Sequence, residues 1–511
     1  MTPPRSNGGG KGNGRVRLRT PWLDIGPTPQ KRPPDPPDRP PRRKTGRDDH
    51  RRPVTARADK PLALAPGSPT PSWVMAAYVV AGLLFIGGVF LAVAGNKEAM
   101  GAVVSGPLLL LIAYLVARRI SATDNNPQLI PILLGAFCLK MAGALVRYWI
   151  AAVLYHSGDF YDYDKWGRRI ASGLRHGHLL SQPGRLAGTD FMRYVTGFIY
   201  FLTPARLLSG FLVYAFLSYI GLIFFWRAYR LAISQKNDLR YLKWVVLLPS
   251  LLYWPSAIGK DAFMVLAAGV ASYGVACLLT TRFLAGITVL SLGAAAMCYV
   301  RPHIALVICA GLVVAVIVGR SQVGVATTLL TIGFTIALAF VVLHASSSFF
   351  GITNFNQASI AKELNDVSAQ SSEGGSSFSP IIANNPIKFP AAAFTVLYRP
   401  LPIESHSGQE LATSIEGIVL LVMTVKTWKR SVRAIRNSRR YPYFAYAFVA
   451  ILVFIFAFSG ISNFGILARQ RTVIEPLLLV FLTLPKPEDD PRTPAARPRQ
   501  NPRFVRPPSV R

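Results

Sequence analysis

Long apolar runs alternate with short polar segments over most of the chain between residues 72 and 484. Most runs have about the length that an α-helix needs to cross the hydrocarbon core of a bilayer, roughly 17–25 residues. The pattern therefore predicts an all-α polytopic membrane protein with about twelve transmembrane helices. The predicted crossings are 73–94, 102–116, 129–155, 207–225, 241–258, 263–279, 284–300, 304–318, 323–343, 411–425, 444–458 and 473–484.

Two longer segments, 156–206 and 345–410, interrupt this alternation, and we predict that both lie on the outer face of the membrane. The first contains an apolar stretch, Phe191–Leu202, that is short for a crossing. If it crossed, basic residues such as Arg227 and Arg240 would face outward, against the excess of Lys and Arg in cytoplasmic loops. We therefore predict an interfacial or re-entrant helix at this stretch.

The two ends of the chain have a different composition from the middle. Residues 1–71 and 485–511 are rich in proline and arginine and poor in apolar residues, which predicts disordered tails on either side of a membrane domain at 72–484. Their positive charge places both tails in the cytoplasm. Two cytoplasmic ends require an even number of crossings.

The chain of 511 residues carries a formal net charge of +32, although 51% of its residues are hydrophobic. In a soluble protein such a charge would suggest binding to nucleic acid. Here much of the excess lies in the tails and in short loops between apolar runs, where topology and anionic lipid headgroups explain it better. We therefore expect the lipid bilayer, and not nucleic acid, as the partner.

The acidic stretch of the first outer segment follows directly on the third apolar run. Asp159, Asp162 and Asp164 fall within six residues, with aromatic residues between them. Carboxylates in this arrangement can act as a general base toward a hydroxyl group or can bind a divalent cation. We predict all three as catalytic residues, and Asp162 and Asp164 as candidate ligands of Mg²⁺ or Mn²⁺. The alternative is an exposed acidic loop with interfacial aromatic anchors.

With the tails inside, the short polar motifs at helix edges all fall on the outer face. Their basic residues suit an anionic, phosphate-bearing substrate, because arginine and free backbone N–H groups at a helix start both bind phosphate. The alternatives are charges that pair with neighbours and arginines that snorkel to the interface. The predicted substrate-binding residues are Lys260, Arg301, His303, Arg399, Arg469 and Arg471.

The end of the second outer segment holds Glu404 and His406 next to two prolines, Pro400 and Pro402. The prolines stiffen the backbone, so either side chain can be held in place for acid or base catalysis. A rigid structural turn is the alternative. Both residues are included among the predicted catalytic residues.

Two charged residues, Lys140 and Arg147, lie inside the third apolar run, seven residues apart and therefore on one helical face. Charges within a membrane usually face the interior of a helix bundle. They either line a polar cavity or neutralise Glu416 or Glu475.

An acidic, Asp-x-Asp-like motif in an early outer loop, followed by an amphipathic stretch, resembles the GT-C class of integral-membrane glycosyltransferases. The motif here is Asp162-Tyr163-Asp164. The stretch from Trp254 to Asp261 and the arginine-bearing outer loops are also similar to polysaccharide polymerases of the O-antigen polymerase type. As architecture, the resemblance covers roughly Leu129 to Leu484. The Pro/Arg-rich tails resemble those of high-GC actinobacterial proteins, which implies a bacterial plasma membrane.

The resemblance implies an enzyme that moves a sugar from a polyprenyl-phosphate-linked donor to a glycan or lipid acceptor at the outer membrane face. In that class the acidic motif serves as base or metal ligand, which implies this role for Asp159, Asp162 and Asp164. Three alternatives remain open at the level of sequence: a polysaccharide polymerase, a transporter or flippase of anionic glycolipids, and a non-catalytic scaffold for cell-envelope assembly.

Overall fold

The structure is a computed structural model, and it describes seven ranges of the chain. The predicted disordered tails lie outside these ranges except for residues 70, 71 and 485, as do parts of the second outer segment. All described residues belong to one compact unit, Asp59–Arg511. The described ranges are 70–178, 187–233, 238–280, 282–319, 325–350, 365–372 and 376–485.

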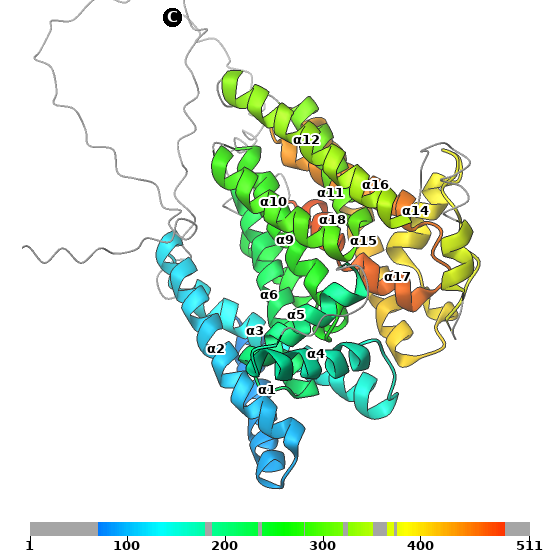
Figure 1. The fold of residues 1–511 in the computed structure, drawn as a ribbon. Coiled ribbons are helices and arrows are strands. Elements are labelled where there is room, and N and C mark those ends of the chain that lie inside the picture. The colour runs from blue at the N-terminus through cyan, green and yellow to red at the C-terminus, as the bar shows by residue number, and fades with distance from the viewer. Residues whose placement is uncertain are drawn as a thin grey trace, which may run out of the picture. The chain divides into compact units, whose positions relative to one another are not determined.

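The first three helices form one edge of the bundle (Figure 1). They are α1 (Ser72–Val93), α2 (Lys97–Asp124) and α3 (Leu129–Tyr148), the last prolonged by a π-helical turn at Trp149–Leu154. Asn96 is the N-cap of α2, and its side chain accepts hydrogen bonds from two backbone N–H groups of the first turn at 3.0 Å. The most apolar window of α1 is only 11% buried, as expected of a surface that faces lipid.

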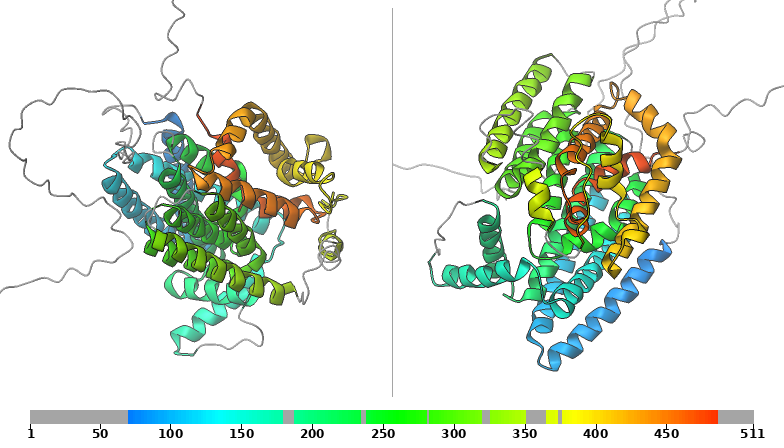
Figure 2. Two further views of the ribbon diagram at one scale, coloured as in Figure 1. Left: turned by 90° about the horizontal axis from the view of Figure 1, so that it is seen from above. Right: turned by 90° about the vertical axis from the view of Figure 1, so that its right-hand side faces the viewer.

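The first outer segment forms two amphipathic helices, α4 (Phe160–Arg175) and α5 (Thr189–Leu202), which pack on each other and project from the bundle (Figure 2). Small residues bring them close: a Cβ on Gly197 would lie 2.4 Å from the Ile170 side chain. The helix predicted at Phe191–Leu202 is confirmed as α5. It is not among the described helices that are long and apolar enough to cross a membrane.

The centre of the bundle contains α6 (Leu207–Ala232) and α9 (Lys260–Leu278), and α10 (Phe283–Val300) packs against α9. Glycines allow α6 and α9 to approach closely, since a Cβ on Gly269 would lie 2.2 Å from the carbonyl oxygen of Gly221. Most of α6 and α9 is buried, which fits their apolar composition all round.

The predicted fifth crossing is a broken helix. It consists of α7 (Asp238–Leu247), α8 (Pro249–Tyr253) and a 3₁₀ turn at Trp254–Ser256. Pro249 opens α8, and Pro255 has non-helical dihedral angles of φ −86° and ψ 47°. The prolines interrupt the helix because they cannot donate the i→i−4 hydrogen bond. Both prolines lie within the predicted crossing 241–258, and the helix breaks at each of them.

The second half of the chain supplies the remaining helices of the bundle. Its long or apolar helices are α11 (Pro302–Val318), α12 (Val325–Phe350), α14 (Phe389–Tyr398), α15 (Gly408–Arg436) and α16 (Pro442–Phe458). A 3₁₀ turn, Pro402–Glu404, precedes α15. Two short helices follow α16, α17 (Phe464–Arg471) and α18 (Glu475–Leu482), and α18 lies within the predicted crossing 473–484.

The described part of the chain is therefore helical, and eight of its helices are long and apolar enough to cross a membrane. They are α1, α2, α3 with its π-helical turn, α6, α9, α10, α12 and α15. The other four predicted crossings correspond to the shorter apolar helices α11 and α16, to the broken helix at α7 and α8, and to the short helix α18.

The contacts of α2 and α6 define two ends of the bundle. Near the start of both helices, Glu98 accepts a hydrogen bond from the backbone N–H of Leu208 at 3.0 Å. Near their last turns, Arg227 binds Asp124 at 2.7 Å. We call the first end, where α4 and α5 lie, the α4 end, and the second the Asp124 end.

Candidate functional site

Four cationic side chains gather around the carboxylate of Asp261 at the α4 end of the bundle. Arg147 comes from the last turn of α3, Lys260 from the first residue of α9, Arg301 from the junction of α10 and α11, and Arg469 from α17. All four act electrostatically on Asp261. We call Asp261 and these four cations the Asp261 cluster.

Within the cluster, Arg301 makes the direct contact with the carboxylate. Its Nη1 donates a hydrogen bond to Asp261 Oδ1 at 2.8 Å, and the two side chains retain 17% and 20% of their exposure. Arg301 thereby joins the start of α11 to the start of α9. Among the described residues, neither Arg147 nor Arg469 forms an ion pair with Asp261, so both act on it through space.

Trp254, from the broken helix, has two of the arginines close to its ring. The Cζ atoms of Arg147 and Arg469 stand 4.8 Å and 5.5 Å from its ring. Arg147 also stands 4.7 Å from the ring of Tyr253 and donates a hydrogen bond to its hydroxyl at 2.9 Å. Because the aromatic face is electron-rich, Trp254 stabilises two guanidinium groups that otherwise repel each other. The break at Pro255 ends the helix next to these rings.

The Asp261 cluster has more positive charge than its own carboxylate can balance. Asp159 and Asp190 also act on Lys260, but the three arginines share the single carboxylate of Asp261. The Nε atoms of Arg147 and Arg469 are both buried and have no hydrogen-bond partner within the described residues. Arg147 is only 8% exposed. Buried donors without a partner are rare in folded proteins, because water or a ligand normally satisfies them. The arrangement therefore suits an anion that enters between α3, α9 and α17.

Asp159 is the predicted catalytic residue that borders on this cluster. It is exposed at the start of α4, and its charge acts on both Lys260 and Tyr163. Lys260 in turn donates a hydrogen bond to the hydroxyl of Thr189 at 3.0 Å, at the start of α5. Burial, with Asp159 as a further cause, raises the pKa of Tyr163 to about 12. The starts of α4, α5 and α9 thus meet at Lys260.

Asp162 lies on the face of α4 that packs against α5. Arg193 donates to Asp162 at 2.8 Å and to Asp190 at 2.7 Å, and it stands 5.4 Å from the ring of Trp166. The hydrogen bond to Asp162 is the main reason why the pKa of Arg193 is raised. Asp162 therefore helps to clamp α4 to α5.

Asp164 points to a different set of partners. Tyr200 donates its hydroxyl to Asp164 at 2.6 Å, and Arg168 donates to the other carboxylate oxygen at 2.9 Å. Arg168 also lies 3.7 Å from Glu98, the residue that binds the start of α6. This network connects α4 and α5 to α2 and α6. Through it, Asp164 helps to hold α4 in position on the bundle.

The carboxylates of the two predicted metal ligands, Asp162 and Asp164, face different sides of α4. Asp162 and Asp164 are two positions apart, which separates them by about 200° around a helix. Their hydrogen-bond partners differ accordingly. Within the described residues there is no group of three or more His, Cys, Asp or Glu side chains that could hold a metal ion. The geometry of this pair thus does not fit a divalent cation held jointly by both carboxylates.

Arg399 and Glu404 bind each other. Arg399 Nε donates to the two oxygens of Glu404 at 2.9 Å and 3.1 Å, and its guanidinium stands 4.8 Å from Phe378 and 5.2 Å from Phe464. This hydrogen bonding lowers the pKa of Glu404. His406 is exposed, and its backbone N–H donates to Glu410 at 2.7 Å. These contacts favour the rigid structural turn that the sequence left open.

The other two predicted substrate-binding residues also have internal contacts. The ring of His303 packs against Phe458 with 5.6 Å between ring centres. Arg471 is 1% exposed, and its Nη1 donates to the backbone carbonyls of Leu397 at 2.9 Å and Arg399 at 3.0 Å. Arg471 therefore fastens α17 to the end of α14.

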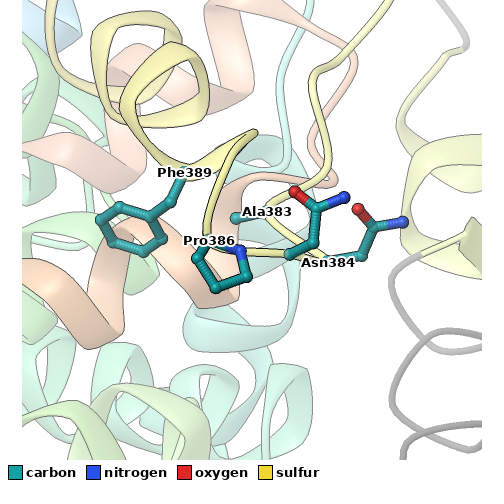
Figure 3. A pocket seen from close by; sticks show the side chains of 5 residues that line it. Ala383, Asn384, Pro386 and Phe389 are labelled. Atoms are coloured by element: carbon teal, nitrogen blue, oxygen red, sulfur yellow. The ribbon is translucent and has the colours of Figure 1, made fainter.

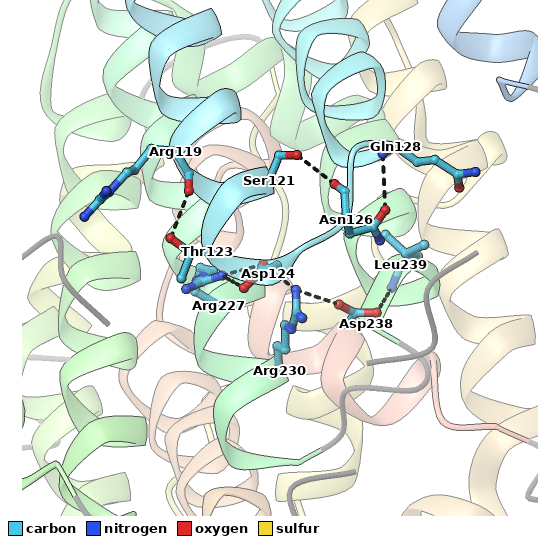
Figure 4. Close-up of polar contacts among 10 residues, drawn as sticks. All are labelled: Arg119, Ser121, Thr123, Asp124, Asn126, Gln128, Arg227, Arg230, Asp238 and Leu239. Atoms are coloured by element: carbon cyan, nitrogen blue, oxygen red, sulfur yellow. Dashed lines mark hydrogen bonds and ion pairs between the residues drawn. The ribbon is translucent and has the colours of Figure 1, made fainter. Parts of the chain in front are cut away.

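The Asp124 end also carries a charged group of residues, drawn in Figure 4. Arg227 donates to both oxygens of Asp124 at 2.9 Å and 2.7 Å, and Arg230 donates to the same carboxylate at 2.5 Å. Arg230 also lies 3.5 Å from Asp238. We call these four residues the Asp124 network. It joins α2, α6 and α7, and its two arginines face two carboxylates.

A pocket of about 440 Å³ lies in the second outer segment, just before and at the start of α14 (Figure 3). Its lining is apolar or amide in character, and it includes none of the predicted site residues. The lining residues are Ala383, Asn384, Asn385, Pro386 and Phe389.

The structure therefore brings together Asp159, Lys260, Arg301 and Arg469. The other predicted site residues contact residues outside the Asp261 cluster. Asp261 and Trp254 were within a predicted motif but were not selected. Arg147 was recognised only as an intramembrane charge. The signal that could have identified it is its place near the C-terminal end of the third apolar run, close in sequence to the acidic stretch.

Comparison of the chain with protein-family models, with curated proteins and with solved structures found no match.

Proposed function

We propose that this protein is a membrane glycosyltransferase that moves a sugar from a polyprenyl-phosphate-linked donor to a glycan or lipid acceptor in cell-envelope polysaccharide synthesis. The observation that carries the proposal is the Asp261 cluster, in which four cations surround one carboxylate and two arginine Nε atoms have no hydrogen-bond partner within the described residues. The phosphate of a lipid-linked donor supplies the missing negative charge. Its polyprenyl chain can extend into the bilayer beside α3.

In this proposal the acceptor hydroxyl attacks the anomeric carbon of the sugar, the bond from that carbon to the phosphate oxygen breaks, and the polyprenyl phosphate leaves. The arginines bind this phosphate. Arg147, Arg301 and Arg469 stabilise the negative charge that develops on it as the bond to the sugar breaks. Asp261 holds Arg301 in place through their hydrogen bond. Lys260, fixed by Thr189, adds a further cation.

Asp159 is the residue that we propose as general base. It borders on the Asp261 cluster and is exposed to solvent, so it can reach the hydroxyl of an acceptor. Asp162 and Asp164 have arginine or tyrosine partners that hold α4 in position. A base that removes a proton from the attacking hydroxyl typically accelerates such a transfer by about 10²–10⁴-fold.

The proposal includes the topology. Twelve crossings, both tails in the cytoplasm of a bacterium and the α4 end on the outer face place the Asp261 cluster at the outer leaflet. Basic residues near the Asp124 end support this orientation by the positive-inside rule, among them Arg430, Arg433 and Arg436 at the end of α15.

The test is a transfer assay with the full chain in proteoliposomes. The donors are polyprenyl phosphates that carry labelled sugars, and the readout is label in a new glycosidic bond. We expect Asp159→Asn to lower the transfer rate by about 100-fold or more, because the base is lost. Asp366→Asn, which changes an exposed carboxylate of the second outer segment, serves as the matched control and should keep full activity.

Retention of full transfer by Asp159→Asn would exclude Asp159 as the base. If Asp162→Asn and Asp164→Asn also kept full activity in folded protein, base catalysis by the acidic stretch would be ruled out. A product that grows by many repeat units in each encounter would instead identify the polymerase, which would use the same phosphate-binding cluster.

A transporter of anionic glycolipids is the second candidate, and one observation favours it. Charged residues continue from the Asp261 cluster into the interior of the bundle: Lys140, Glu416, Arg471 and Glu475 are all buried there. Buried charges along a path are typical of transport proteins. Movement of labelled donor across the vesicle membrane, without a new glycosidic bond, would favour this function over transfer.

A further inference from the structure

Two glutamates and one arginine form a buried group inside the bundle, away from the Asp261 cluster. Glu416 lies on α15, Arg471 ends α17, and Glu475 begins α18. Their side chains are almost inaccessible, with relative exposures of 5%, 1% and 0%. Glu416 is eight residues into α15, which places it about 12 Å below the start of that helix. We call this group the Glu475 centre.

The carboxylate oxygens of the centre have fewer hydrogen-bond donors than buried carboxylates need. Glu416 accepts one backbone hydrogen bond, from Ser250 at 2.7 Å, on Oε2. Its Oε1 and both oxygens of Glu475 have no hydrogen-bond partner within the described residues. Glu416 and Glu475 also act electrostatically on each other.

Arg471 is the cation of the centre, and it is shared with the backbone. Its Nε lies 3.4 Å from Glu475 Oε1, is buried and makes no hydrogen bond within the described residues. Its Nη1 is occupied by the carbonyls of Leu397 and Arg399. One guanidinium therefore faces two carboxylates.

The other titratable groups next to the centre have contacts of their own. Lys140, on α3, donates to the carbonyl of Leu251 at 2.5 Å. Tyr241, on α7, donates to the carbonyl of Pro476, and the hydroxyl of Tyr398, on α14, pairs with Thr424. None of these contacts supplies a second positive charge to the two carboxylates.

We propose that Glu416 and Glu475 hold one proton between them, so that the Glu475 centre is a proton-binding site inside the membrane bundle. With one proton the group is neutral: one carboxylate pairs with Arg471, and the other is a carboxylic acid. Two ionised carboxylates beside one guanidinium would leave a net charge among buried side chains, which is strongly unfavourable.

A proton fits the centre better than a metal cation does. A sodium ion needs several oxygen ligands and would lie next to the guanidinium of Arg471, 3.4 Å from a Glu475 oxygen. A proton needs only the two carboxylates. This inference does not depend on glycosyl transfer, since the centre is separate from the residues proposed to act on the donor.

The test is infrared spectroscopy of the full chain in lipid nanodiscs. A protonated carboxyl has a carbonyl stretch apart from the bands of ionised carboxylates. We expect this band in the wild-type protein at neutral pH. Either Glu416→Gln or Glu475→Gln should remove it completely, because the glutamate that remains then pairs with Arg471. Glu410→Gln, which changes a less buried glutamate on the same helix, should leave the band unchanged.

Complete loss of the band in each single variant indicates one shared proton. If the two glutamates were protonated independently, each variant would remove only half of the band. Absence of the band in wild-type protein would overturn the proposal, as would stabilisation of the protein by sodium at constant ionic strength. If the glutamine variants did not fold, the wild-type band would still decide the question through its titration. The band must disappear in a single step as the pH is raised.

Discussion

Charged side chains gather at both ends of the helix bundle, but the two groups are balanced differently. In the Asp124 network two arginines face two carboxylates, and Asp124 alone accepts hydrogen bonds from both of them. In the Asp261 cluster four cations face a single carboxylate, and two guanidinium groups stand over one tryptophan ring. The charges of the first arrangement balance, whereas the second has an excess of cations, which in our proposal the phosphate of the donor balances.

This difference gives a way to separate structural from functional charges in a chain of this kind. A balanced group should affect folding when it is changed, and it should leave ligand binding alone. An unbalanced group should show the reverse. The predictions below test this contrast, from the largest expected effect to the smallest.

The largest effect is expected at Asp124. Asp124→Asn leaves Arg227 without its carboxylate in a partly buried site, which should lower the free energy of unfolding by about 3–5 kcal/mol. Thermal unfolding in detergent measures the loss, and Asp366→Asn is the control on an exposed carboxylate. Transfer activity per folded molecule should not change. If activity fell and stability did not, the Asp124 network would serve function and not stabilise the fold, which would contradict this contrast.

Arg469→Gln should have the opposite result. Arg469 stands near Arg147 and has no ion pair within the described residues, so its loss should leave stability unchanged or improve it. Affinity for a polyprenyl phosphate should fall by roughly 10–100-fold, the value of a charge-assisted hydrogen bond. Isothermal titration in detergent gives both affinities, with Arg433→Gln as the control on the exposed end of α15. Equal affinities for Arg469→Gln and wild type would contradict the proposed phosphate site.

A smaller effect concerns the pair of Arg399 and Glu404. The pKa of Glu404 is lower in the folded chain than in the unfolded chain, mainly through hydrogen bonds from Arg399. Its contribution is therefore present above the unfolded pKa of about 4.3 and is lost as the pH falls through the folded pKa. Arg399→Gln should lower the unfolding midpoint at pH 7 and make it less sensitive to acid. Thermal scans from pH 7 to pH 3 check this, and an unchanged acid profile would argue against the structural turn.

The smallest effect is expected at Trp254. Trp254→Leu keeps an apolar side chain but removes the aromatic face under Arg147 and Arg469. At about 0.5–1 kcal/mol for a cation–π contact, affinity for a polyprenyl phosphate should fall roughly two- to fivefold. Trp428→Leu is the control, since Trp428 is exposed and lies in the C-terminal part of α15. An affinity that rises in Trp254→Leu would show that the ring does not organise the arginines for an anion.

The helical fold could be predicted from the sequence because apolar runs of sufficient length have few other solutions in a membrane. The amphipathic helix at Phe191–Leu202 and the break near Pro255 followed from equally local signals. The lengths of α2 and α15 could not be predicted as well, because 102–116 and 411–425 were predicted and the helices span Lys97–Asp124 and Gly408–Arg436. Both helices continue into polar turns, which a hydropathy pattern does not locate.

The site was less accessible to such reasoning. Lys260 and Arg301 were predicted because each stands at a helix edge, which a hydropathy pattern locates. The same argument also selected Arg471 and Arg399, whose contacts are with backbone carbonyls and with Glu404. Hydropathy places a residue along the membrane normal but does not say which neighbour it faces. That information depends on how the helices are arranged around one another.

The close contact between Gly221 and Gly269 has a consequence for how mutations reach the proposed site. Asp261 stands eight positions before Gly269 on α9, so the helix acts as a lever of about 12 Å with its pivot at the glycines. One added methyl group at Gly269 would push α9 away from α6, because no space exists there. The displacement would be transmitted to Lys260 and Asp261 at the end of the lever. An alanine deep in the bundle, far from any charge, would thus alter the spacing of the cations around Asp261.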